Sequence, residues 1–444
     1  MTAAPAGVRV PSRRTQRISI VVAGFGQNLV LTTVTTFVLV YLLQYAQIST
    51  QGMAVVTAII TAARIFDAVT DPVMGSVIDM TRSRWGKLRP YILFSAVPVA
   101  VLSTALFAVP DVAEPAQLLF FGVCYFLWGI AYTVCDVPYW GLIGAAFPEP
   151  AYRTRVISDV RAFGGIALGL ATLGMPWLAR LLSVDGHGGE TTGTGWSLAV
   201  GVVSVLGMGL FLLAFTNTRE HHTPGVCDRL TFGELFRTLL RNTPLLMVLL
   251  GSVLGFGRYI VQAGGAVFVV IAYDDEGAFT LIGGAIIVGM VLASFATPLL
   301  LRRMTARTLV VASSVIGAAL YVAMYFAGFA DIRVLLVFVF LTGLTLGVFL
   351  VVQATMIADA VDDVERRTGV RNDGISFSSL TFVSKIMNAL AILVFGVFIV
   401  VAGYEAGASV TPDMQWTVFA SLTLVPAASC LVSAVPFLFY RLGR

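Results

Sequence analysis

The sequence predicts an all-α membrane protein whose twelve transmembrane helices form two halves of six. Of its 444 residues, 58% are hydrophobic and only 12% are charged, whereas soluble proteins carry about 25% charged residues. Apolar runs of about 20 residues, the length that crosses a bilayer as a helix, recur along the whole chain. Lysine and arginine are concentrated in alternate loops between these runs, as in multi-span membrane proteins.

The first half is expected at residues 18–216, after a basic tail at 1–17. Its first apolar run is too long for a signal peptide and has no clear cleavage site, so we expect it to be retained as a helix. Polar segments and breaks at proline and glycine separate the runs that follow. The expected spans are 18–46, 50–78, 91–109, 116–146, 157–182 and 195–216.

The second half is expected at residues 243–440, followed by a short tail at 441–444. The longest loop, 217–242, precedes it and divides the spans six and six, so we interpret this loop as a linker between two bundles. Its spans are expected at 243–272, 279–301, 308–329, 332–362, 373–403 and 414–440. A transporter built from two such halves would bind its substrate near the middle of the membrane, between them.

The orientation follows from the basic residues of the loops. Twenty-two lysines and arginines lie in the segments on the side of both termini and the linker, against only Arg180 and Arg333 on the other side. Because positive loops stay in the cytoplasm, both termini and the linker are expected to be cytoplasmic, in a plasma (inner) membrane.

The sequence offers little support for other kinds of site. The four cysteines include no CxxC pair, and the three histidines fall in loops, so no zinc or histidine metal site is expected. We find no nucleophile beside a base and no cofactor-binding loop. The sequence therefore predicts neither an enzyme nor a bound cofactor nor a nucleic-acid partner.

Charged residues on the second span form the first candidate site. Arg64, Asp67 and Asp71 are three and four residues apart, so they share one face of a helix. Carboxylates inside a membrane are costly and usually mark an ion or substrate pathway. The alternative is a structural salt bridge with Arg64.

The fourth span carries an acid between aromatic residues. Tyr132, Asp136 and Trp140 recur every four residues, with Thr133 beside them. A carboxylate accepts hydrogen bonds from sugar hydroxyls, and aromatic rings pack against sugar rings. A core aromatic stripe with one paired acid is the alternative. Arg161 on the fifth span would either pair with Asp136 or donate to substrate hydroxyls.

Three further polar positions lie inside spans. Gln27 and Asn28 on the first span would bind substrate or hydrogen-bond a neighbouring helix. Lys385 needs a carboxylate partner, for which Asp67 or Asp71 of the other half would serve, unless it reaches the membrane interface. Arg258 would either face the substrate or extend to the interface, and the sequence favours neither.

Two charged segments at the expected cytoplasmic side are candidate gates. Salt bridges between the halves at these segments would close the inner side, and a solvated charge cluster is the alternative. The first contains Asp79, Arg82 and Arg84, and the second contains Asp359, Asp362, Asp363, Glu365, Arg366, Arg367 and Arg371.

Five segments resemble the glycoside–pentoside–hexuronide:cation symporters, and especially their melibiose permease branch. They occur in the family order and cover nearly the whole chain. The segments are RIFDAVTDPVMG, TRSRWGKLRPYIL, YTVCDVPYWGLI, VRAFGG and IADAVDDVERRTGVRNDG.

The resemblance implies a major facilitator fold and sugar transport coupled to Na⁺, Li⁺ or H⁺. It also implies roles for individual positions. Asp67, Asp71 and Thr133 are similar to the family's cation ligands. Asp136, Trp140 and Arg161 are similar to its sugar contacts, and Lys385 is similar to a lysine near both sites.

Two departures leave the substrate and the ion open. Gln27 and Asn28 stand where the melibiose branch has lysine and aspartate, and Thr70 stands where it has asparagine. Thr70 would still offer the cation an oxygen. Two buried carboxylates side by side repel each other, so a proton held by one of them is the other candidate coupling ion.

The sequence therefore predicts a cation-coupled symporter of a sugar or glycoside that works by alternating access. The expected partners are this solute, the coupling cation and the lipid bilayer, and a monomer is expected. A symporter of a lipid or another amphipath and a membrane sensor that does not transport are the alternatives.

The topology can be tested by labelling introduced cysteines from outside intact cells. An impermeant maleimide should react with Gly186→Cys and Gly277→Cys, since both positions are expected in outer loops. It should not react with Gly225→Cys in the linker. External labelling at position 225 would reverse the predicted orientation.

Overall fold

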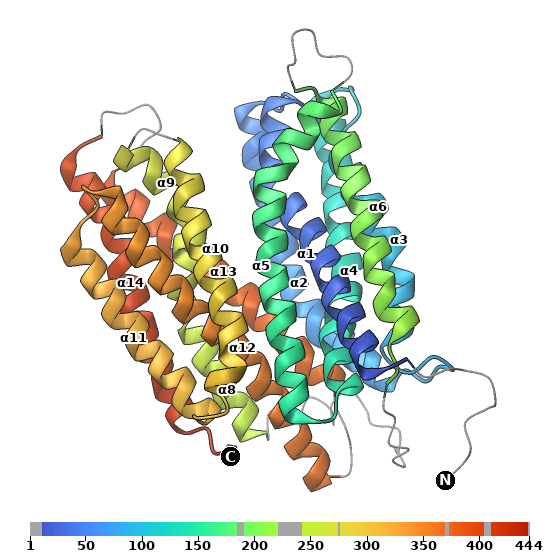
Figure 1. Ribbon diagram of the computed structural model, residues 1–444. Helices are drawn as coiled ribbons and strands as arrows, with labels where there is room; N and C mark the ends of the chain where they lie inside the picture. Colours follow the sequence, from blue (N-terminus) through green and yellow to red (C-terminus); the bar gives the residue numbers. More distant parts are fainter. Residues whose placement is uncertain are drawn as a thin grey trace.

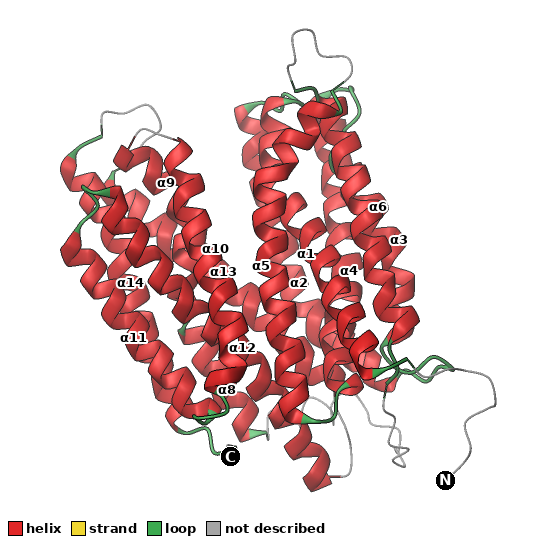
Figure 2. Cartoon of the chain, viewed as in Figure 1, coloured by secondary structure: helices red, strands yellow, loops and turns green. Residues whose placement is uncertain are grey.

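The computed structural model describes residues 11–183, 191–220, 242–273, 276–368, 373–403 and 410–442, and over these residues it contains helices and no strand. Figure 2 shows this all-helical architecture. The first half contains α1 (Arg13–Gln44), α2 (Thr50–Met80), α3 (Arg89–Ala105), α4 (Glu114–Ala146), α5 (Pro150–Leu181) and α6 (Gly193–Asn217). The second half contains α8 (Thr243–Leu254), the 3-10 helix η1 (Phe256–Tyr259), α9 (Ile260–Tyr273), α10 (Glu276–Leu300), α11 (Ala306–Ala327), α12 (Ile332–Thr368), α13 (Asp373–Ala402) and α14 (Pro412–Leu438).

Most of these helices have the length and composition of membrane spans. Among the described residues, nine helices are long and apolar enough to cross a membrane. The bent pair at α8 and η1 makes a tenth if it is counted as one span. The apolar helix α3 has 17 residues, and α2 has 31 residues but carries several charges. The all-α, multi-span prediction is confirmed, whereas the number twelve stays a prediction. The linker expected at 217–242 also stays a prediction, because residues 221–241 lie outside the described part of the chain.

Several helices begin earlier than the hydropathy of the sequence predicts. Helix α1 begins at Arg13 rather than near residue 18, with Ser12 accepting a hydrogen bond from the backbone of Thr15. Helix α5 begins at Pro150 rather than near residue 157, because proline suits the first turn of a helix. Hydropathy marks the part of a helix that lies in the bilayer, and polar residues extend the helix beyond it.

The span expected at 243–272 is helical but broken near its middle. Helix α8 ends at Leu254, and the chain bends by 49° into the segment Phe256–Gln262. Gly255 ends α8 by donating its N–H to carbonyls of the preceding turn. Apolar composition alone does not reveal this break, because the residues around it are as apolar as those of an unbroken span.

The helices form two bundles, α1–α6 and α8–α14, that stand side by side (Figure 1). The most extensive contacts between the bundles join α2 with α13 and α5 with α10, with further contacts of α13 with α4 and of α12 with α5. Helix α1 begins and helix α14 ends at the same end of the bundles (Figure 1). Of these connecting helices, α2, α4, α5, α12 and α13 carry charged positions singled out above, and α10 carries none.

Candidate functional site

A buried ion cluster lies at the contact between α2 and α13. Asp67 and Asp71, one turn apart on α2, are 6% and 0% exposed. Lys385 of α13 donates a hydrogen bond to Asp71 Oδ1 at 2.7 Å, and its Nζ lies 3.9 Å from Asp67 Oδ2. The structure thus brings the lysine of one half together with both acids of the other.

Hydroxyl groups complete the surroundings of Asp71. Thr133 of α4 donates to Asp71 Oδ1 at 3.0 Å, and Thr381 of α13 donates to Asp71 Oδ2 at 3.0 Å. Lys385 Nζ also donates to Thr133 Oγ1 at 3.3 Å. Sequence reasoning missed Thr381, although its position four residues before Lys385 places both on one face of α13.

Two residues predicted for this cluster form no hydrogen bond or ion pair with its carboxylates. The hydroxyl of Thr70 donates to the backbone carbonyl of Asp67 at 3.1 Å, within its own helix. Arg64 is close enough to Asp67 and Tyr125 to interact electrostatically. It forms no ion pair with a carboxylate in the described part of the chain. The charge that pairs with the acids therefore comes from Lys385 rather than from Arg64.

A second polar group lies on α1 and α4. Gln27, which is 1% exposed, donates from Nε2 to Asp136 Oδ1 at 2.8 Å. Asn28 instead donates to the carbonyl of Gly24 at 2.8 Å, in its own helix, and lies against Gly164 of α5. The two neighbouring amides therefore have different hydrogen-bond partners, and only Gln27 contacts the candidate sugar-binding acid.

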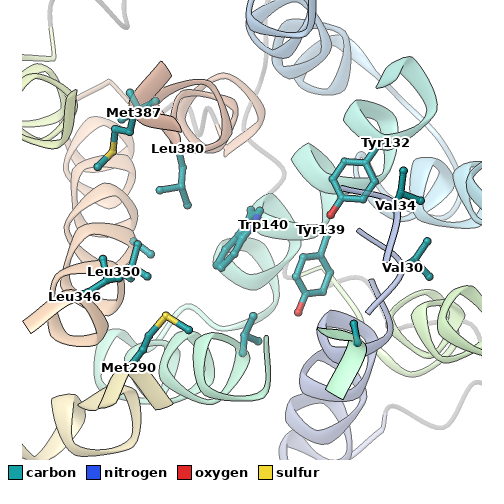
Figure 3. Packing of buried hydrophobic residues seen from close by; sticks show 14 of the residues in the cluster. Val30, Val34, Tyr132, Tyr139, Trp140, Met290, Leu346, Leu350, Leu380 and Met387 are labelled. Atoms are coloured by element: carbon teal, nitrogen blue, oxygen red, sulfur yellow. The ribbon is translucent and has the colours of Figure 1, made fainter. Parts of the chain in front are cut away.

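Arg161 and Trp140 form the third part of the site. The Arg161 guanidinium lies 4.3 Å from the centre of the Trp140 ring, an arrangement typical of a cation–π contact. Figure 3 shows Trp140 pointing from α4 toward Leu350 and Leu380 of the second half, with Tyr132 on the other side of α4. Tyr132 is buried and stacks on another α4 aromatic ring.

The expected salt bridge between Arg161 and Asp136 does not form among the described residues. Asp136 accepts its hydrogen bond from Gln27, and the buried Nε of Arg161 has no hydrogen-bond partner. Arg161 therefore forms no direct salt bridge with Asp136 in this structure, and its role as a donor to substrate hydroxyls stays a prediction.

A second ionic connection between the halves lies near the end of the bundles where α1 begins and α14 ends. Arg153 of α5, which is 0% exposed, donates from Nη2 to Asp359 at 3.0 Å and to Asp362 at 2.7 Å. Both aspartates lie near the end of α12. Sequence reasoning counted Arg153 as a loop residue, because hydropathy placed the start of α5 after it.

The other predicted gate residues have different surroundings. Asp363 pairs with Arg366 and Arg367 of its own helix, at 3.6 and 2.8 Å. The Arg84 guanidinium lies 4.5 Å from the centre of the Trp85 ring. Asp79, Arg82 and Glu365 each have an interaction partner. Arg371 lies outside the described residues.

Comparison with known protein families identifies the chain. Residues 19–444 match the sequence model of the family described as MFS/sugar transport protein. The chain belongs to this family. It is a multi-span membrane transporter of the major facilitator superfamily and not an enzyme.

Individual relatives and solved structures agree with this membership. The chain is 27% identical to the glucuronide carrier protein homolog of Escherichia coli (strain K12), over 90% of this chain and 86% of that protein. It is 25% identical to the isoprimeverose transporter of Lactiplantibacillus pentosus, over 97% and 89%. Its fold matches the crystal structure of the E. coli fucose:proton symporter with a TM-score of 0.70, at 14% identity, over 96% of this chain and 98% of that chain.

Breaking the Arg153 contact should separate α5 from α12 in this transporter. In Arg153→Gln, Asp359 and Asp362 lose their common cation, which should weaken the contact by about 3 kcal/mol, the lower end for buried pairs, because the two acids are partly exposed. Spin labels at Arg155 and Arg366 should report a longer or broader distance distribution.

The matched control is Arg13→Gln, which removes an exposed ion pair with Glu149 inside the first half. It should leave the distance between the labels unchanged. An unchanged distance in Arg153→Gln as well would mean that the ion pair does not hold these helices together.

Proposed function

We propose that this protein is a secondary active symporter that carries a sugar or glycoside together with a monovalent cation, Na⁺ or H⁺, across the plasma membrane by alternating access. The observation that carries the proposal is the contact of Lys385 with Asp71 and Asp67 across the two halves. An ion cluster at this contact couples charge to the relative position of the halves.

The coupling step follows from the charges in the cluster. The single positive charge of Lys385 lies beside two buried carboxylates, and its ammonium contacts oxygens of Asp71 and Thr133. A cation bound by the same oxygens, or a proton on one acid, would take over part of the lysine's role. Lys385 would then be free to leave Asp71, so α13 could move relative to α2. A ligand shifts a conformational equilibrium in this way when it binds one state more tightly than the other.

The solute side of the proposal rests on the group around Asp136. Its carboxylate, the Arg161 guanidinium and the Gln27 amide offer hydrogen bonds to hydroxyl groups, and the Trp140 ring offers an apolar face. This combination suits a polyhydroxylated ring better than a lipid tail. The names of two relatives, a glucuronide carrier homolog and an isoprimeverose transporter, support a sugar or glycoside.

The proposed gate is the Arg153 contact. With both termini cytoplasmic, as the positive loops predict, the ion pairs to Asp359 and Asp362 would hold the cytoplasmic ends of the two halves together. This arrangement corresponds to the outward-facing stage of the cycle. A structural neighbour with a TM-score of 0.68 at 15% identity is described as outward-facing, which supports this assignment. Transport as a monomer is part of the proposal.

The coupling role can be tested with accumulation assays under one imposed gradient at a time. Asp67→Asn and Asp71→Asn should each abolish accumulation driven by a Na⁺ or pH gradient, because the neutral amide no longer exchanges a cation for Lys385. Downhill exchange should remain. The measurement is uptake of labelled sugar into membrane vesicles, with Asp159→Asn as the control, since Asp159 pairs with Arg17 inside the first half.

Accumulation at the wild-type level in both cluster variants would reject the coupling role. Which gradient drives wild-type uptake identifies the ion.

The substrate site can be tested at Asp136. A panel of radiolabelled methyl glycosides, methyl pentosides and methyl glucuronides is first screened for uptake into transporter-deficient cells. For the best substrate of the panel, Asp136→Ala should weaken binding by about 2 kcal/mol, or about thirtyfold in Kd, because it also leaves the buried Gln27 amide unpaired.

Asp136→Asn is the matched variant, which keeps the side-chain volume and removes the charge. Binding by purified Asp136→Ala at the wild-type Kd would exclude this acid from the sugar site. Uptake of lipids in place of any sugar would favour the amphipath alternative, and no transport at all would favour the sensor.

A further inference from the structure

The break in the seventh span is held by serine side chains of α14. Ser429 Oγ donates to the carbonyl of Leu254 at 2.6 Å and accepts the N–H of Gly257 at 2.9 Å. Both are backbone groups that a continuous helix would bond internally. A side chain at position 257 would collide with Ser429 and with the backbone of Pro426. The break is therefore built into the packing of α8 and η1 against α14.

Arg258 is buried at this break without an acidic partner. It is 2% exposed, and no carboxylate lies within ion-pair distance in the described residues. Its guanidinium donates to Ser314 of α11 at 2.7 Å, to Ser433 of α14 at 3.3 Å and to the Gly255 carbonyl at 3.4 Å. It also lies 4.1 Å from the centre of the Phe349 ring.

These contacts exclude both alternatives that the sequence left open for Arg258. It faces neither the substrate nor the membrane interface, but the core of the second half. A buried charge is costly unless dipoles replace its water. One of the oxygens that do so, the Gly255 carbonyl, belongs to the break itself. Arg258 and the bend therefore depend on each other.

The geometry of η1 then sets the direction of the next residue. A 3-10 helix has three residues per turn, so successive side chains point about 120° apart. Gly257 packs against α14, and Arg258 points to α11 and α12. Tyr259 takes the third direction, and its ring lies within electrostatic range of Arg161 of the first half.

Two polar groups without a hydrogen-bond partner, one in each half, thus lie within electrostatic range of each other. The Tyr259 hydroxyl forms no hydrogen bond among the described residues, and the buried Nε of Arg161 has none either. The unpaired Nε of Arg161 is buried, which is costly, and a bound hydroxylated ligand would remove this cost. Tyr259 is only partly buried, as a residue that lines a solute site would be.

We propose that Tyr259 is a sugar contact supplied by the second half, opposite Arg161, and that Arg258 is the positioning residue that holds it there. This inference rests on the proposed sugar transport. A sugar hydroxyl between the two side chains would accept from Arg161 and exchange a hydrogen bond with Tyr259. Because the two groups belong to different halves, the sugar would be held fully only when the halves are in this arrangement.

The first test removes the Tyr259 hydroxyl alone. For the methyl glycoside or glucuronide of the panel with the highest wild-type uptake, Tyr259→Phe should raise KM about tenfold, the effect of one hydrogen bond in a buried site, with Vmax and the unfolding temperature unchanged. The control is Tyr273→Phe in the same span, which removes a structural hydrogen bond to the Phe329 carbonyl. It should leave KM unchanged.

A wild-type KM in Tyr259→Phe would overturn the inference while leaving the proposed function intact. Failure of the wild-type protein to take up any sugar of the panel would instead reject the proposed function.

The second test asks whether Arg258 acts through Tyr259. Arg258→Lys keeps the charge but loses the forked contacts, so KM should rise several-fold in the wild-type background. In the Tyr259→Phe background the same change should have no further effect on KM. A merely structural role would give equal effects in both backgrounds, and that result would overturn the positioning role.

Ser433→Ala provides a second variant if Arg258→Lys does not fold. It removes one acceptor of Arg258 and the hydroxyl that donates to the Gly251 carbonyl, at 2.7 Å. Ser433→Ala should raise KM in the wild-type background and have no further effect on KM in the Tyr259→Phe background. Equal effects in both backgrounds would overturn the positioning role.

Discussion

The pairing of Lys385 with Asp71 and Asp67 is the interaction on which the arrangement of the two halves depends. Both acids lie on α2 and the lysine lies on α13, so separating these helices would leave three charges without partners in an apolar surrounding. Thr133 and Thr381 fill the remaining positions around Asp71. The cluster is therefore both a connection between the halves and a place where a cation can change the strength of that connection.

Three cations inside this transporter are held in two different ways. Lys385 faces two acids of the other half, and Arg153 also faces two acids across the halves. Arg258 has no acid within ion-pair distance in the described residues and is held by hydroxyls, a carbonyl and an aromatic face. The first two connections can break and re-form as the halves move. The third lies inside one bundle, so it belongs to a unit that we expect to move as a rigid body.

The broken seventh span gives the second half a role in the central site. A continuous helix would satisfy its own backbone, whereas this one depends on Ser429 and Arg258. In membrane transporters, interrupted helices are found where the backbone or its neighbours approach a bound solute. The break lies in the half opposite Asp136 and Arg161, which is where a solute held between two halves needs a second set of contacts.

The sequence by itself determined the fold class, the family and the residues worth examining, because apolar length, loop charge and charged positions inside spans are local properties of the chain. Tertiary structure decided the partners. Asp67 and Asp71 were predictable as a pair by their spacing, but Thr381 became part of the cluster only when α13 packed against α2. Arg153 and Arg258 show the same limit. In the sequence, each is an ordinary basic residue. Its role follows from its burial by helices that are distant in the chain and that supply its hydrogen-bond partners.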